Sequence, residues 1–248
     1  TLMVKPESVW NDLIVQLIER YLLHIDPSLE LEPYLVTPLG ISQGLVMFVK
    51  GSKSLFEIEK NGTIMNWLSD SHQSKCSADI QKTFMRSCAI TCVLSLLLGF
   101  GDRHLQNILC SGDTGRLIHI DYGFVFGEEP TVSRHRFWLP EQIIRLTPGM
   151  LQVVRTHFYK DFLSLCTSIN RMVRSVAVDL YYICWALIPV GSTDEQKMGA
   201  HFTSFLLPYT MSASDADAAI VNVIEHETKT SSTPFTSIMH KFMRYLDR

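Results

Sequence analysis

Two short polar motifs, each set between strongly apolar segments, constrain this chain of 248 residues more than any other feature. The first motif reads Gly-Asp-Arg-His-Leu-Gln-Asn and places Asp102, His104 and Asn107 on one short turn. The second reads His-Ile-Asp-Tyr-Gly and carries Asp121. Leucine and isoleucine flank both motifs, so we expect both carboxylates at the rim of a hydrophobic core. Gly101 is expected to supply a backbone conformation that a residue with a Cβ would resist.

The side chains of the two motifs are of the types that phosphoryl transfer requires. Carboxylate and amide oxygens are hard ligands that suit Mg²⁺, and a neighbouring histidine can accept a proton from a hydroxyl. Together they supply the parts needed to transfer phosphate from a metal-bound nucleoside triphosphate. The alternative is an exposed loop with a chance Asp-Arg-His tripeptide, which requires two ordered motifs to coincide by accident.

In this order, the motifs resemble the catalytic loop and the start of the activation segment in the phosphatidylinositol 3-/4-kinase superfamily. Ordinary protein kinases read His-Arg-Asp at the same step, so the order of the three residues separates the families. The resemblance implies that Asn107 and Asp121 are ligands of Mg²⁺, with Mn²⁺ as an alternative ion. It also implies that His104 accepts the proton of the substrate hydroxyl and that Asp102 organises the catalytic loop. Tyr122 stands where the family usually has Phe, and either ring can pack on an apolar surface.

Composition sets looser limits on the chain. Hydrophobic residues make up 46% of it and charged residues 19%, which favours a sizeable core over disorder. The net charge of −3 argues against nucleic acid as the main partner. No run approaches the roughly 20 apolar residues of a transmembrane helix, and the first residues lack the layout of a signal peptide. Six cysteines without a Cys-x-x-Cys pair favour buried thiols in a reducing cytosol over a zinc site.

Hydrophobic periodicity predicts a small lobe of mixed structure followed by a helical large lobe. This agrees with the α+β, two-lobed kinase-like fold that the resemblance implies, with an incomplete N-lobe and a larger, mainly helical C-lobe. We expect residues 1–49 to form the partial N-lobe and hinge. Residues 50–248 should form the C-lobe with the catalytic loop, the activation segment and a C-terminal helix.

The individual elements follow from the same pattern. Extended segments are predicted at residues 2–5, 31–38, 44–49, 107–109 and 117–120, with the second and third pairing as one hairpin and the last two as another. Helices are predicted at residues 11–23, 54–61 and 78–98, and after residue 150 with breaks at 191–197 and 228–234. Residues 124–148 read as a loop. The buried face of the first helix is predicted to comprise Leu13, Ile14, Leu17, Ile18 and Leu23.

Lys5 is the expected partner of the ATP phosphates, because a lysine at the end of a small-lobe strand can neutralise their charge. By the resemblance, Asp12 is expected to pair with Lys5, although the segment between them is one residue shorter than in the family. The alternative is a solvated lysine and an ordinary aspartate near a helix start. The family's phosphate-covering loop should lie upstream of Lys5. The sequence is therefore a fragment, or the protein works without that loop, or it does not catalyse.

The remaining nucleotide contacts are implied by position alone. The connector between the lobes carries Val49 as the backbone partner of adenine, with Met47 and Phe48 as its neighbours. Leu109 and Ile120 would form the floor of the adenine pocket. The alternative for the connector is a simple strand end.

The loop after the second motif is expected to meet the inositol headgroup. Its basic residues are Arg134, His135 and Arg136, and Glu128 and Glu129 oppose them. Several headgroup phosphates would call for a larger basic cluster, so the loop favours plain phosphatidylinositol. A solvated basic triplet without a ligand is the alternative.

The C-terminal segment, residues 232–248, reads as an amphipathic helix with basic residues, which suits either a membrane interface or packing on the large lobe. Its place after the preceding acidic stretch resembles the tail of class III phosphatidylinositol 3-kinases.

These observations predict a kinase that transfers the ATP γ-phosphate to phosphatidylinositol at a membrane surface, at the 3-hydroxyl. The alternatives are a phosphatidylinositol 4-kinase, a protein Ser/Thr kinase of the superfamily and a non-catalytic kinase-like module. The resemblance further implies a regulatory subunit and a cytoplasmic location, peripheral on endomembranes.

Overall fold

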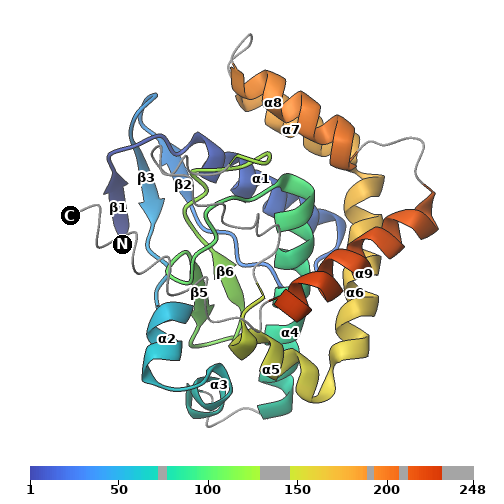
Figure 1. The fold of residues 1–248 in the computed structure, drawn as a ribbon. Helices are drawn as coiled ribbons and strands as arrows, with labels where there is room; N and C mark the ends of the chain where they lie inside the picture. The colour runs from blue at the N-terminus through green and yellow to red at the C-terminus, as the bar shows by residue number, and fades with distance from the viewer. Residues whose placement is uncertain (72–76, 129–145, 189–192, 207–211, 231–248) are drawn as a thin grey trace, which may run out of the picture.

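The described part of the chain consists of two three-stranded sheets and a larger group of helices, with β1 at the outer edge of the molecule (Figure 1). The computed structural model describes residues 1–71, 77–128, 146–188, 193–206 and 212–230. The predictions for Arg134, His135 and Arg136 and for the helix at 232–248 lie outside the described residues. The α+β class predicted from the sequence is confirmed.

The first sheet joins β1 (Leu2–Lys5), β2 (Val36–Pro38) and β3 (Gly44–Met47) in the antiparallel order β1-β3-β2. The predicted hairpin between the second and third strands is confirmed, with Val36 opposite Val46. The prediction was wrong for residues 31–35, which form no strand. Two of their apolar residues, Leu31 and Tyr34, are instead buried in the core, whereas Leu35 is exposed.

The second sheet joins β4 (Ser52–Ser54), β5 (Ile108–Ser111) and β6 (Leu117–His119), again antiparallel. The predicted hairpin of β5 and β6 is confirmed. Strand β4 escaped prediction because Ser-Lys-Ser carries no apolar alternation, and only its pairing with β5 makes it a strand.

The helices of the described ranges differ widely in length. In chain order they are α1 (Trp10–Ile25), α2 (Leu55–Asn61), α3 (Ile64–Ser71), α4 (Ser77–Leu98), α5 (Pro148–His157), α6 (Tyr159–Ser175), α7 (Ala177–Leu187), α8 (Thr193–His201) and α9 (Ala213–Thr230), with the short π-helix η1 at Phe202–Leu206. None of these helices is long and apolar enough to span a membrane.

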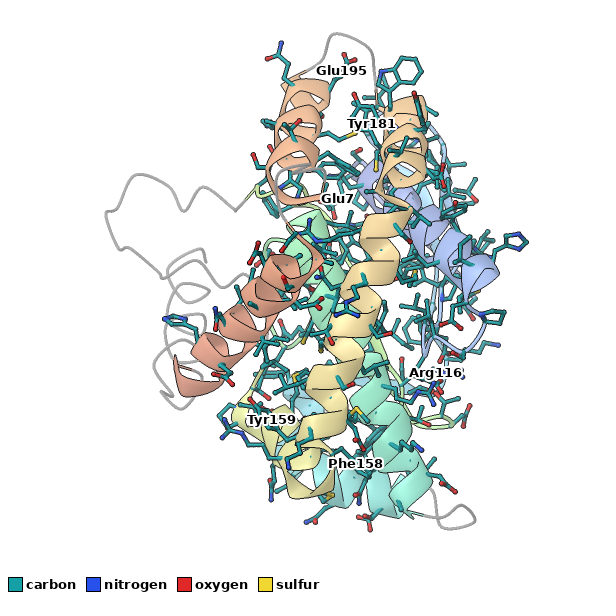
Figure 2. The ribbon with its side chains drawn as sticks, turned by 90° about the vertical axis from the view of Figure 1, so that its right-hand side faces the viewer. Glu7, Arg116, Phe158, Tyr159, Tyr181 and Glu195 are labelled. Atoms are coloured by element: carbon teal, nitrogen blue, oxygen red, sulfur yellow. The ribbon has the colours of Figure 1, made fainter. Side chains whose placement is uncertain are left out.

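Helix α4 runs through the middle of the molecule, and α6 lies along it with α9 beside α6 (Figure 1, Figure 2). Most of its residues from Phe84 to Leu98 are buried, so α4 has no polar face there. It ends at Gly99, whose φ of 59° is the left-handed value common after a helix. A Cβ at Gly99 would lie 2.4 Å from the backbone nitrogen of Gly127, so the helix end also requires the space.

Helix α2 begins at Leu55, one residue after the predicted start, and ends at Asn61 as predicted. The Ser54 side chain accepts a hydrogen bond from the Glu57 backbone N–H, and the Glu57 carboxylate accepts one from the Ser54 backbone N–H. This reciprocal capping satisfies two backbone donors that a helix start leaves unpaired.

The predicted buried face of α1 is partly wrong. Ile14 and Ile18 are buried as expected, whereas Leu13, Leu17 and Leu23 are only partly buried. The buried face instead includes the polar residues Asp12, Gln16 and Glu19. These three find polar partners outside the helix, which an apolar pattern alone does not reveal.

The predicted break at 191–197 is also wrong in its second half, because α8 begins at Thr193. Asp194 and Glu195 lie in the first turn of α8, where acidic side chains favour a helix start. The predicted break at 228–234 likewise begins too early, because α9 runs to Thr230.

Candidate active site

The β5–β6 hairpin brings the two sequence motifs side by side. Ile108 pairs with His119 across the hairpin, and the Ile120 backbone N–H donates to the Asn107 carbonyl at 3.0 Å. Asn107 and Asp121 therefore leave the same end of the hairpin. The prediction that this hairpin holds the two segments together is confirmed.

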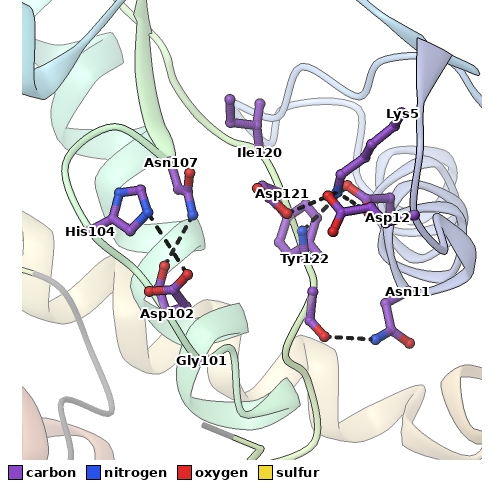
Figure 3. Close-up of polar contacts among 12 residues, drawn as sticks. Lys5, Asn11, Asp12, Gly101, Asp102, His104, Asn107, Ile120, Asp121 and Tyr122 are labelled. Atoms are coloured by element: carbon purple, nitrogen blue, oxygen red, sulfur yellow. Dashed lines mark hydrogen bonds and ion pairs between the residues drawn. The ribbon is translucent and has the colours of Figure 1, made fainter. Parts of the chain in front are cut away.

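The catalytic loop is a series of tight turns between α4 and β5. The His104 backbone N–H donates to the Asp102 carbonyl at 3.0 Å, and the Asn107 N–H donates to the His104 carbonyl at 2.9 Å. Asn107 Nδ2 also donates to the Asp102 carbonyl at 3.2 Å, which turns Oδ1 away from the loop (Figure 3). His104 Nε2 lies 3.8 Å from Asp102 Oδ2. The loop thus presents an amide oxygen and an imidazole from one rigid turn.

Gly101 is required for a different reason from the one predicted. Its φ is not positive, whereas Asp102 has a φ of 51°. A Cβ at Gly101 would lie 2.1 Å from the Glu128 carbonyl oxygen and 2.9 Å from the Phe124 Cβ. The Gly101 N–H also donates to the Phe124 carbonyl at 3.0 Å, so close packing of the two segments selects glycine.

Arg103 is a site residue that the sequence prediction missed. Its side chain is buried and donates three hydrogen bonds to carbonyl oxygens, those of Gly101, Ile120 and Asp121. The guanidinium also lies 5.0 Å from the centre of the Tyr122 ring. Arg103 therefore ties the catalytic loop to the segment that carries Asp121. The only sign of this role in the sequence was the position of Arg103 between Asp102 and His104. The pattern does not show that its side chain reaches Ile120 and Asp121.

Lys5 lies opposite the catalytic loop among three carboxylates (Figure 3). Its Nζ is 2.8 Å from Asp121 Oδ1, 3.4 Å from Asp12 Oδ2 and 3.3 Å from Glu7 Oε1. Burial lowers the pKa of Lys5, but the attraction of Asp12, Asp121 and Glu7 outweighs it and raises the pKa above its usual value. The predicted pairing of Lys5 with Asp12 is confirmed, and the lysine stays cationic.

Asp12 is the buried member of this group. Its Oδ1 accepts hydrogen bonds from the Tyr122 backbone N–H at 3.3 Å and from the Tyr34 hydroxyl at 3.2 Å. Burial raises the pKa of Asp12 more than the charge of Lys5 lowers it. Asp12 therefore connects α1 to Lys5 and to the backbone of the second motif.

Tyr122 is fully buried, as its place beside the core predicts. Its ring meets Phe100 edge-on, with the ring centres 4.9 Å apart. This confirms that tyrosine packs here on an apolar surface. Its hydroxyl contacts Glu19 of α1, which no sequence motif indicated.

The connector residues lie at and just after the carboxyl end of β3, the central strand of the first sheet. The Met47 N–H donates to the Leu35 carbonyl, and the Phe48 N–H donates to the Thr1 carbonyl. The Val49 carbonyl accepts from Ser52 Oγ at 2.8 Å. A hydrogen bond from Val49 to adenine would therefore use its N–H, and this role stays a prediction.

Leu109 and Ile120 lie on one face of the second sheet. Leu109 pairs with Ile118, and Ile120 follows two residues later, so the three side chains point to the same side. Leu109 and Ile120 are half-buried against the core. This position suits the predicted pocket floor, which stays a prediction.

Asn107 and Asp121 fit the donor set that Mg²⁺ uses beside nucleotides. Magnesium is held there by one or two carboxylates, with phosphate oxygens and water completing its shell. The Asp121 side chain is 45% exposed and so accessible to a metal ion. Within the described ranges, no group of three or more His, Cys, Asp or Glu side chains could hold a metal by itself. Asn107 and Asp121 as ligands of Mg²⁺ stay a prediction.

Comparison with known proteins points to one family. The family model for phosphatidylinositol 3- and 4-kinases matches residues 59–186, which include both motifs. The chain is 30% identical over 194 residues to the nodule isoform of phosphatidylinositol 3-kinase from Glycine max, covering 74% of this chain and 23% of that protein.

Two further relatives carry similar names. Identity is 28% over 200 residues with phosphatidylinositol 3-kinase VPS34 of Arabidopsis thaliana, covering 75% of this chain and 24% of the relative. Identity is 28% over 249 residues with phosphatidylinositol 3-kinase pik3 of Schizosaccharomyces pombe, covering 94% of this chain and 30% of that protein. The chain thus spans about a quarter of the length of the relatives it matches.

Proposed function

The chain belongs to the phosphatidylinositol 3- and 4-kinase family, and on that premise we propose that it transfers the γ-phosphate of ATP to phosphatidylinositol. The observation that carries the proposal is the meeting of Lys5, Asp121 and Asn107 at one end of the β5–β6 hairpin. A cation, a carboxylate and an amide oxygen are the groups that position and neutralise a triphosphate.

Each side chain then has a distinct task in the proposed reaction. Asn107 and Asp121 would hold Mg²⁺, or Mn²⁺ in its place, and the bound ion would neutralise charge on the phosphate oxygens. Lys5 keeps its positive charge close to Asp121 and would meet the phosphates from the opposite side. His104 would accept the proton of the inositol hydroxyl as the hydroxyl oxygen bonds to the γ-phosphorus, while the bond from that phosphorus to the β–γ bridging oxygen breaks and ADP leaves. Asp102 lies close enough to His104 to orient the ring and stabilise its charged form.

We propose the 3-hydroxyl as the site of transfer. Its support is the set of relatives named phosphatidylinositol 3-kinase at 28% to 30% identity. The catalytic loop itself would serve a 4-kinase equally well, because the choice of hydroxyl depends on how the inositol ring sits. The proposal further includes a membrane surface as the place of reaction, since the lipid's acyl chains stay in the bilayer. The cytoplasmic, endomembrane location and the regulatory subunit are part of the same proposal.

A direct choice of substrate class tests the proposal. The protein is incubated with labelled Mg-ATP and either phosphatidylinositol vesicles or a mixture of Ser/Thr peptides. We expect label in the lipid alone, and none when the vesicles contain only phosphatidylcholine. Label in peptides alone would support the protein-kinase alternative. Nucleotide binding without any transfer would support a non-catalytic module.

A further inference from the structure

A buried polar contact between α1 and the second motif lies next to the proposed metal ligand. The Tyr122 hydroxyl donates to Glu19 Oε1 at 3.4 Å, and both side chains are buried. Tyr122 follows Asp121 directly, so whatever holds the tyrosine also sets the backbone of Asp121. Glu19 takes no part in the proposed chemistry, which leaves its burial to be explained.

Helix α1 holds Tyr122 at two points. Asp12 accepts the Tyr122 backbone N–H, and Glu19 accepts its hydroxyl. These two acids are seven residues apart, which places them two turns apart on the same face of a helix. Arg103 covers the ring from the side of the catalytic loop. Tyr122 is therefore fixed in position and in rotation.

Such fixation is needed at this point of the chain. Asp121 has a φ of 61°, a left-handed conformation that a residue with a Cβ adopts at a cost. A conformation of this kind persists where the surrounding structure holds it. The carboxylate of Asp121 faces Lys5, whereas its carbonyl accepts from Arg103. Loss of one anchor would let the Asp121 backbone relax and move its carboxylate away from Asn107.

Glu19 is suited to this task as a neutral acid. Burial raises its pKa to about 8, although Tyr122, Gln16 and Arg20 favour the ionised form. The Gln16 amide approaches Glu19, but its nitrogen stays outside hydrogen-bonding geometry with any residue that the structure describes. The hydrogen bond that Glu19 accepts from the candidate site is therefore the one from the Tyr122 hydroxyl.

We propose that Glu19 is a positioning residue, which through its hydrogen bond to the Tyr122 hydroxyl holds Asp121 opposite Asn107. This inference rests on the proposed function for its catalytic consequence. Its structural consequence, the fixation of the Asp-Tyr-Gly segment, is independent of any substrate. Glu19 of α1 and Tyr122 of the second motif therefore fix Asp121 together, through the hydrogen bond that joins them.

The test compares Glu19→Leu, Glu19→Gln, Tyr122→Phe and the Glu19→Leu/Tyr122→Phe double variant in the full protein. Glu19→Gln keeps a neutral oxygen acceptor, so we expect its kcat to stay within about twofold of wild type. Glu19→Leu and Tyr122→Phe should each lower kcat about tenfold, because small displacements of a reacting group are costly. The double variant should be no worse than either single variant, since both remove the same bond. Additive losses, or equal losses in Glu19→Gln and Glu19→Leu, would overturn the proposal.

Hydrogen exchange across residues 117–126 supplies a readout without substrate. We expect faster exchange in Glu19→Leu and wild-type protection in Glu19→Gln, while circular dichroism shows both folded. Unchanged exchange in a folded Glu19→Leu variant would contradict the proposal. If wild-type protein does not phosphorylate lipid but exchange follows this pattern, the proposed function fails and the positioning role stands.

Discussion

At the scale of single residues, the charges of the site are balanced only as a group. Lys5 is 12% exposed and shares its charge among Asp12, Asp121 and Glu7. A buried charge that loses its partner keeps the full cost of desolvation. Each member of the group can therefore be tested by a change that keeps shape and removes charge.

Asp121→Asn is the sharpest such change at the proposed metal site. We expect metal-dependent turnover to fall by at least about 100-fold, because an amide binds Mg²⁺ far more weakly than a carboxylate. The free energy of unfolding should change by less than about 1 kcal/mol, because the Asp121 side chain is partly exposed and Lys5 keeps Asp12 and Glu7 as partners. Initial rates over a range of Mg²⁺ concentrations measure the first effect, and urea unfolding measures the second.

Asp70→Asn is the matched control, because Asp70 is exposed on α3 and away from the motifs. It should leave both the rate and the stability unchanged. Wild-type turnover in Asp121→Asn would remove Asp121 from the metal site.

The proton on Glu19 predicts a pH dependence of stability. Burial raises the pKa of Glu19 from 4.5 to about 8, so the folded protein retains a proton that the unfolded chain releases between these values. The free energy of unfolding therefore falls as pH rises through this window. Glu19→Gln lacks this ionisation, so its stability relative to wild type should increase by a few kcal/mol between about pH 5 and pH 8. Urea unfolding at several pH values checks this, and a pH-independent difference would contradict a raised pKa.

At the scale of elements, the catalytic loop and the segment at 124–128 pack without room for side chains between them. The Gly101 N–H donates to the Phe124 carbonyl, the Phe126 N–H to Leu98 and the Gly127 N–H to Gly99. These three bonds dock the segment at 124–128 onto the end of α4 and the loop that follows it. The position of the second motif, which carries Asp121, therefore depends on backbone contact as well as on side chains.

Gly101→Ala tests this packing. Its new Cβ would lie 2.1 Å from the Glu128 carbonyl oxygen, so the two segments must separate. We expect a loss of about 2 kcal/mol in the free energy of unfolding, with a loss of turnover of about tenfold or more. Urea unfolding and initial rates measure the two effects.

Gly40→Ala serves as its control, because no heavy atom lies within 4 Å of a Cβ built there. It should be neutral in both assays. A neutral Gly101→Ala would show that the two segments are not in such close contact.

At the scale of the whole molecule, a single cluster of buried residues joins both sheets to the helices. It extends from Leu22 of α1 through Phe84 of α4 to Phe162 of α6. The division into an N-lobe at 1–49 and a C-lobe at 50–248 stays a prediction, and buried residues of both ranges belong to this cluster. A shared core favours one cooperative unfolding transition.

Leu22→Ala and Phe84→Ala test this cooperativity from opposite sides of the predicted division. Both side chains are fully buried, so each change should cost about 2–5 kcal/mol. We expect both variants to shift the same single transition in urea, followed by circular dichroism and by fluorescence. Two separate unfolding transitions, one of which shifts in Leu22→Ala but not in Phe84→Ala, would contradict a shared core.

The sequence alone predicted the parts of the fold that depend on local pattern. The long helix α4, the β5–β6 hairpin and the meeting of Asn107 with Asp121 follow from apolar runs and turn residues. It could not predict the burial of Arg103 or Glu19, because charged residues are usually exposed. Glu19 meets Tyr122, and Arg103 meets Ile120 and Asp121 as well as the nearby Gly101, so the assembled fold supplies most of their partners.

The most direct measurement is the position of the transferred phosphate, with site variants as controls. Phosphatidylinositol vesicles are incubated with labelled Mg-ATP, and the product is compared with 3-phosphate and 4-phosphate standards. We expect label on the 3-hydroxyl from the wild-type protein and almost none from His104→Ala or Asp121→Asn. Label on the 4-hydroxyl would contradict the proposed position. Equal label from wild type and both variants would contradict the site itself.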